Sequence, residues 1–69
     1  MKIKVNGEEK YLELGNERVL LSSTLELLGY KSNTVVVEVN KLIINSKKWD
    51  EKILKDGDRL EIVSIVGGG

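Results

Sequence analysis

The sequence of 69 residues contains no cysteine and no histidine. Their absence excludes disulfide bonds, thiolate or imidazole metal ligands, and nucleophiles that depend on cysteine or on a histidine base. The sequence also has only three aromatic side chains, Tyr11, Tyr30 and Trp49, and therefore no platform on which nucleic-acid bases could stack. Most catalytic mechanisms used by small enzymes are thus unavailable to this chain.

An excess of positive charge is also missing, because eleven Lys and Arg residues balance eleven Asp and Glu residues. The longest apolar runs, at residues 19–21, 35–37 and 42–44, are far shorter than the ~20 residues that span a bilayer. The N-terminal residues lack the apolar stretch of a signal peptide. We therefore expect a cytoplasmic protein, a monomer when free, with neither nucleic acid nor a membrane as a partner.

What the sequence does contain is a globular balance of 41% hydrophobic and 32% charged residues. We expect one domain over residues 1–66, with a core of Val, Ile and Leu, and a C-terminal glycine tail at residues 67–69. At the N-terminus, Ile3 and Val5 alternate with lysines, and Leu12 and Leu14 alternate with polar residues. The Asn-Gly pair at positions 6 and 7 tolerates positive φ, which predicts a β-hairpin with a type I′ turn.

A helix is predicted within residues 18–28, where leucines recur on one face. Gly29 follows the last of them and can end the helix in the left-handed conformation. Its start is open, because residues 19–21 could extend a strand and Ser22 or Ser23 could be the N-cap. The leucines that form the predicted face are Leu21, Leu25 and Leu28.

Strands are predicted at residues 34–39, 42–44 and from Leu60 to the glycine tail, the first of them rich in β-branched residues. The spacing of Trp49, Ile53 and Leu54 predicts one helical turn at the edge of the core, and an Asp-Gly-Asp turn follows at residues 56–58. The order of elements favours an α+β fold, a mixed sheet of four to five strands packed by one main helix. With the first and last strands parallel, this is the ubiquitin-like β-grasp.

Alternation along the last strand separates two faces. Leu60, Ile62 and Val66 are expected to face the helix, whereas Val63 and Ile65 lie on the opposite face, beside Val36. We predict that Val63, Ile65 and Val36 form an apolar patch that docks a partner protein. The alternative is that neighbouring strands or the Trp49 segment cover them.

The C-terminal Gly67, Gly68 and Gly69 are not needed by a structural domain, and chance gives three glycines there only roughly three times in ten thousand. Glycines make a thin thread that can enter a narrow channel and deliver the ionised carboxylate of Gly69. That carboxylate can attack the α-phosphate of a nucleotide held by another enzyme. A flexible, idle terminus is the alternative.

Other candidate residues favour structural roles. Asp56 and Asp58 lack the companion oxygen ligands of a metal site, so turn and capping roles are expected and no metal site is predicted. Trp49 is expected to close the core, although a role as a docking anchor stays open. An enzyme would need a pocket around Glu38 or Asp58, and no catalytic constellation is recognisable, so no catalytic residue is assigned.

Four segments together make a pattern that covers essentially the whole chain. They are the hairpin start Lys2-Ile3-Lys4-Val5-Asn6-Gly7, the segment Val35-Val36-Val37-Glu38-Val39-Asn40 with Ile43-Ile44, the Trp49 segment, and Lys55-Asp56-Gly57-Asp58-Arg59-Leu60-Glu61-Ile62 leading to Val66-Gly67-Gly68-Gly69. In these segments the chain resembles the ThiS sulfur carriers of thiamine biosynthesis.

This resemblance implies a carrier, not an enzyme, whose Gly69 is adenylated by an E1-like enzyme of the ThiF or MoeB type and then converted to a thiocarboxylate. It implies no bound cofactor, with ATP used by the activating partner, and sulfur donation to a thiazole synthase. A third glycine, Gly67, stands where many relatives have only two. Carriers of the MoaD (molybdopterin synthase) type, ubiquitin-like modifiers, and a β-grasp interaction module with an idle tail remain as alternatives.

Overall fold

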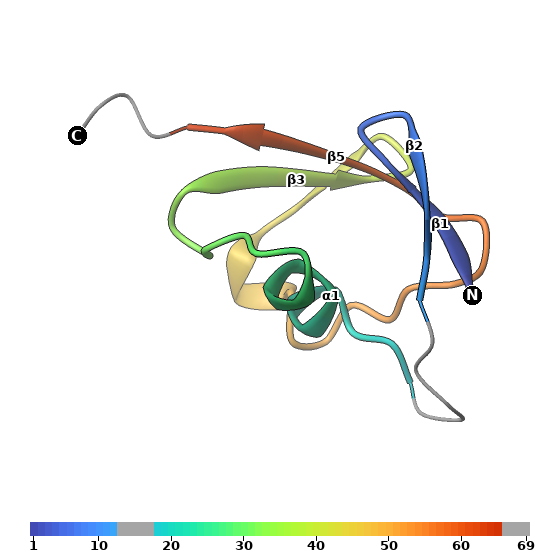
Figure 1. Cartoon of the computed structure of the whole chain (residues 1–69). Helices are drawn as coiled ribbons and strands as arrows, with labels where there is room; N and C mark the ends of the chain where they lie inside the picture. The colour runs from blue at the N-terminus through green and yellow to red at the C-terminus, as the bar shows by residue number, and fades with distance from the viewer. Residues whose placement is uncertain (13–17, 66–69) are drawn as a thin grey trace.

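The computed structural model describes residues 1–12 and 18–65 (Figure 1). Predictions about Leu14, Val66 and the glycine tail fall outside these residues. No helix among the described residues is long and apolar enough to cross a membrane. The elements, in chain order, are β1 (Lys2–Val5), β2 (Glu8–Tyr11), α1 (Leu21–Leu27), β3 (Val35–Val39), β4 (Leu42–Ile44), the 3-10 helix η1 (Ser46–Lys48) and β5 (Arg59–Ser64).

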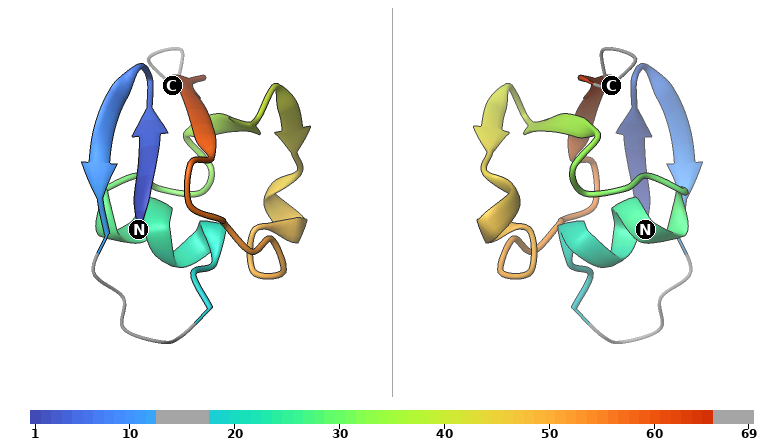
Figure 2. Two further views of the ribbon diagram at one scale, coloured as in Figure 1. Left: turned by 90° about the vertical axis from the view of Figure 1, so that its right-hand side faces the viewer. Right: turned by 90° about the vertical axis from the view of Figure 1, so that its left-hand side faces the viewer.

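The five strands form one mixed sheet in the order β2-β1-β5-β3-β4. β1 and β5 are parallel, while the other neighbouring pairs are antiparallel. The hairpin and β4 lie at the two edges, and α1 lies against one face (Figure 2). This arrangement confirms the predicted ubiquitin-like β-grasp and places β5, the strand that leads to the tail, in the middle of the sheet.

The core lies between α1 and the inner face of the sheet. Leu21 and Leu25 of the helix are at most 2% exposed, and inward-facing residues of the strands pack against them. Thr24 is the buried polar residue of the helix, and its hydroxyl donates to the Leu20 carbonyl at 3.0 Å. The strand residues in the core are Ile3, Val5, Val35, Val37, Val39, Leu60 and Ile62.

The turns predicted from glycine are confirmed. Asn6 and Gly7 have φ values of 52° and 85°, the positive values that a type I′ hairpin turn requires. Gly29 and Gly57 both have φ of 90°, where a residue with a Cβ would be strained. The chain therefore turns at the glycines that the sequence singled out for positive φ.

The start of α1, which the sequence left open, does not use Ser22 or Ser23 as N-cap. The helix begins at Leu21 with Leu20 as N-cap, which makes no side-chain cap hydrogen bond. Instead, the amides of Leu21 and Ser22 donate to the carbonyls of Lys52 (2.8 Å) and Trp49 (3.1 Å). Unpaired amides at the helix start are thus satisfied by backbone from a distant segment, which makes a serine cap unnecessary.

The predicted helical turn from Trp49 to Leu54 is misplaced. The 3-10 helix η1 precedes Trp49, which is its C-cap, and Ile53 forms an isolated β-bridge with Leu20. Trp49 itself is only 5% exposed and donates its indole N–H to the Ile44 carbonyl at 2.9 Å. Its expected role in closing the core is therefore confirmed.

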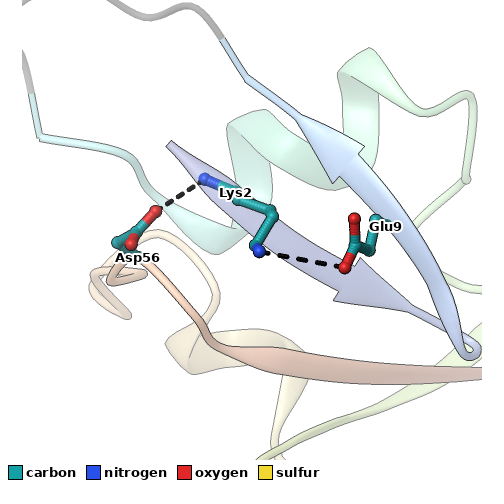
Figure 3. Close-up of polar contacts among 3 residues, drawn as sticks. All are labelled: Lys2, Glu9 and Asp56. Atoms are coloured by element: carbon teal, nitrogen blue, oxygen red, sulfur yellow. Dashed lines mark hydrogen bonds and ion pairs between the residues drawn. The ribbon is translucent and has the colours of Figure 1, made fainter.

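The Asp-Gly-Asp turn holds the start of β5 against β1. Asp56 Oδ1 accepts the backbone N–H of Lys2 at 2.7 Å, and the Lys2 ammonium lies 3.8 Å from Glu9 (Figure 3). Asp58 accepts from the Lys55 amide at 2.8 Å and from the Asn40 side chain at 2.9 Å. Both aspartates therefore have the predicted turn and capping roles.

Replacing Asp58 with alanine should destabilise the domain by about 1–2 kcal/mol, because two hydrogen bonds to an ionised acceptor are lost. Urea unfolding followed by tryptophan fluorescence measures the change. Asp58→Asn, which keeps one carbonyl acceptor, is the matched control and should lose less. Equal midpoints for Asp58→Ala and the wild type would show that these bonds do not stabilise the turn.

Candidate functional site

The outer face of the sheet, opposite α1, carries apolar side chains near the end of β5. Val36 of β3 lies directly across from Val63 of β5. Val63 is 57% exposed and Ile65 is 56% exposed, while Val36 is half-buried. The predicted patch is therefore open to solvent, and the alternative that neighbouring strands or the Trp49 segment cover Val63 and Ile65 is wrong.

Ile43 extends this surface, and the sequence analysis did not find it. It lies across from Glu38 on β4, on the same outer face as Val36, and is 68% exposed. Ile43, Val36 and Ile65 also line a common surface hollow. Counting the alternation outward from the Asn40-Lys41 turn would have placed Ile43 there. We call Val36, Ile43, Val63 and Ile65 the apolar strip.

The apolar strip includes Ile65, the last described residue before the tail. The amide of Ile65 donates to the Thr34 carbonyl at 2.9 Å, so the sheet holds the chain up to the last described residue. Gly67, Gly68 and Gly69 lie outside the described residues. Covalent geometry alone limits residues 66–69 to a reach of at most about 14 Å beyond Ile65. A partner that receives Gly69 must therefore come close to the strip.

The carboxylates considered for catalysis do not form a catalytic arrangement. Glu38 lies directly opposite Glu61 on the outer face, and both oxygens of Asp58 accept the turn hydrogen bonds. Among residues 1–12 and 18–65, no group of three or more acidic, His or Cys residues could hold a metal ion.

The ubiquitin-like β-grasp fold, here with three glycines in the sequence after the central strand β5, is typical of small carrier and modifier proteins. Within this class, the ThiS family model matches residues 3–69, which includes the tail. The chain belongs to the ThiS family.

Comparisons with individual proteins agree with this assignment. The crystal structure of the thiamine biosynthesis protein ThiS from Geobacter metallireducens superposes with a TM-score of 0.83 at 30% identity, over 100% of both chains. The uncharacterised protein ycf40 of Trieres chinensis is 35% identical over 94% of this chain and 85% of its own length. A thiazole synthase of Paramagnetospirillum magneticum is 36% identical over all of this chain, which spans only 20% of that protein.

These findings establish the general role of the chain. The ThiS family consists of small sulfur carrier proteins that do not themselves catalyse the reactions they serve. The chain is therefore a sulfur carrier of the thiamine biosynthesis type and not an enzyme. The expectation of a carrier is confirmed, whereas the roles expected for Gly69 and for the patch of Val36, Val63 and Ile65 stay predictions.

Proposed function

We propose that the carboxylate of Gly69 carries sulfur as a thiocarboxylate. The single observation that carries this proposal is the ThiS family match, which continues through the tail to residue 69. β5 supports it physically, because a central strand bonded on both sides gives the tail a rigid origin. The sequence has no cysteine, so no side-chain thiol is present that could carry sulfur as a persulfide instead.

The chemistry proceeds in two steps on the partner. A carboxylate oxygen of Gly69 attacks the α-phosphorus of ATP, the bond to the β-phosphate oxygen breaks, and pyrophosphate leaves with the electron pair. Hydrosulfide then attacks the acyl carbon of the adenylate and displaces AMP, which leaves a thiocarboxylate and releases one proton. A persulfide donor would instead form an acyl disulfide, which a thiol must then reduce.

Two partners follow from this chemistry. An E1-like adenylyltransferase of the ThiF or MoeB type supplies the ATP site, so this chain needs no cofactor of its own. A thiazole synthase accepts the sulfur. The second assignment is supported by two thiazole synthases, from Paramagnetospirillum magneticum and Magnetococcus marinus, in which a segment 36% or 35% identical to this chain occupies a fifth of the length.

The proposed function gives the apolar strip a role as the surface that docks these partners. Exposed aliphatic side chains next to the reacting tail can exclude water at the mouth of a partner's channel. Val63 and Ile65 are the central members because Val63 lies on β5 and Ile65 directly follows that strand toward the tail. Docking would bury side chains that are more than half exposed in the free protein.

Replacing Val63 or Ile65 with aspartate should raise the Kd for the adenylyltransferase at least about fivefold, since an interface contact of this kind is worth more than about 1 kcal/mol. Isothermal titration calorimetry measures the binding, and circular dichroism checks the fold. Leu27→Asp is the matched control, because Leu27 is 64% exposed on α1, beyond the other face of the sheet. Unchanged binding by folded Val63→Asp and Ile65→Asp would refute docking through the strip.

A further inference from the structure

The two edges of β5 are used differently along its length. Toward β3, the odd-numbered residues exchange hydrogen bonds, and this pattern continues to Ile65, whose amide donates to Thr34. Toward β1, the even-numbered residues are used: the Leu60 carbonyl accepts the Asn6 amide at 2.9 Å. The hydrogen bonding of β5 toward β1 can therefore end at a different residue from its hydrogen bonding toward β3.

The edge toward β1 is closed by a side chain. β1 ends at Val5, and the Asn6 side-chain amide takes the place of further backbone. Its Oδ1 accepts the Ile62 N–H at 2.7 Å, and its Nδ2 donates to the Ile62 carbonyl at 3.2 Å. Gly7, with φ of 85°, then turns the hairpin away. The pairing on this edge stops at Ile62.

Ser64 is the next residue whose backbone points to that edge. It lies across from Val35 at a position where the ladder with β3 makes no hydrogen bonds, because the bonded positions are the odd ones. Ser64 is exposed, and in the described part of the chain its N–H and carbonyl lie on the edge where the pairing with β1 and with the Asn6 side chain has already ended. Figure 1 shows β5 running past the hairpin alongside β3.

A partner that encloses Gly69 must cover this open edge. Residues 66–69 reach at most about 14 Å, so the walls of the partner's channel begin near Ser64. Covering an amide and a carbonyl without replacing their water hydrogen bonds costs about 1–3 kcal/mol. An extended backbone segment lying beside β5 supplies one donor and one acceptor at the required spacing.

We propose that the adenylyltransferase adds such a segment to the open edge of β5 and bonds the backbone N–H and carbonyl of Ser64. This inference rests on the proposed function and deepens it by naming how the tail is gripped. The Asn6 amide sets where the added segment ends, since Ile62 has no free bonding position on that edge. Recognition here is by backbone, whereas the apolar strip is recognised through side chains.

Ser64→Pro tests the pairing, because proline removes the N–H on the open edge and leaves the ladder to β3 intact. We expect kcat/KM for adenylation, measured by ATP–pyrophosphate exchange with the ThiF-type enzyme of the same host, to fall at least tenfold. Ser64→Ala, which keeps the N–H, should stay within twofold of the wild type. Equal rates for Ser64→Pro and the wild type would overturn the pairing but leave the proposed function standing. A wild-type chain that is not adenylated would overturn the proposed function as well.

Amide hydrogen exchange of the wild-type chain gives a second test that needs no variant. In the free protein the Ser64 amide should exchange faster than those of Ile62 and Ile65, which are hydrogen-bonded. Saturating adenylyltransferase should slow exchange at Ser64 at least tenfold. Unchanged exchange at Ser64 in the complex would overturn the proposal even if Ser64→Pro failed to fold.

Discussion

Removing Gly68 and Gly69 together is expected to abolish sulfur loading. The shortened chain still ends in a carboxylate, but that group is withdrawn by up to about 7 Å from where the full tail places it. Because a misplacement of 1 Å can cost about a hundredfold in rate, we expect loading to fall by more than about a thousandfold. Intact mass after incubation with ATP, sulfide and the activating enzyme measures it, since the thiocarboxylate adds the difference between sulfur and oxygen.

Because the tail has three glycines, deleting Gly69 alone is a poor negative control for the double deletion. Deleting Gly69 alone leaves Gly67 and Gly68 as a terminal pair. That variant would still end in the two glycines found in many relatives, so it could still be loaded with sulfur. A full-length chain with a Gly69 carboxamide is better matched, because only the nucleophilic oxygen is replaced. We expect no mass gain from it. Loading of either the carboxamide or the double deletion would refute the role of Gly69, whereas an idle tail predicts that even the wild type gains no mass.

The second large effect is expected at Leu60. This side chain is 1% exposed, lies on the central strand and faces α1, so its replacement by alanine leaves a cavity. Such changes cost about 2–5 kcal/mol. A domain of this size has only roughly 3–10 kcal/mol of stability in total. We therefore expect Leu60→Ala to be partly or wholly unfolded at room temperature.

Urea unfolding compares Leu60→Ala with Val63→Thr, a variant on the same strand. Val63 points to the opposite face, is 57% exposed, and threonine keeps its branched shape. A change within about 0.5 kcal/mol is expected for Val63→Thr. Similar losses for the two variants would contradict the assignment of one face to the core and the other to solvent.

Local chemistry predicted much of this fold. The Asn-Gly turn, the glycine that ends α1 and the alternation along β5 each depend on residues near one another in sequence, so the sequence indicates them directly. The start of α1 and the placement of the Trp49 segment depend instead on backbone bonds between distant segments, such as Leu21 to Lys52. A sequence pattern of only one helical turn, such as that of Trp49, Ile53 and Leu54, contains no information about these bonds to distant segments.

The candidate site was predictable to the same degree. Exposure of Val63 and Ile65 followed from the alternation of β5, whereas Ile43 was missed because β4 is three residues long and shows little alternation of its own. The Asn6 contact with Ile62 joins residues 56 positions apart, and no local sequence pattern near either residue predicts it. The glycine tail could be identified from the sequence because it depends only on three consecutive residues of one type that follow a predicted strand.

The central position of β5 has a mechanical consequence. A partner that draws the tail into a channel pulls along the axis of a strand bonded to β1 on one side and β3 on the other. Because the bonds between strands lie across that axis, the load falls on many of them at once, in shear, and does not peel them one at a time. An edge strand under the same pull would be held on one side only, whereas β5 is held on both, so the domain can bear more tension while its last residue reacts.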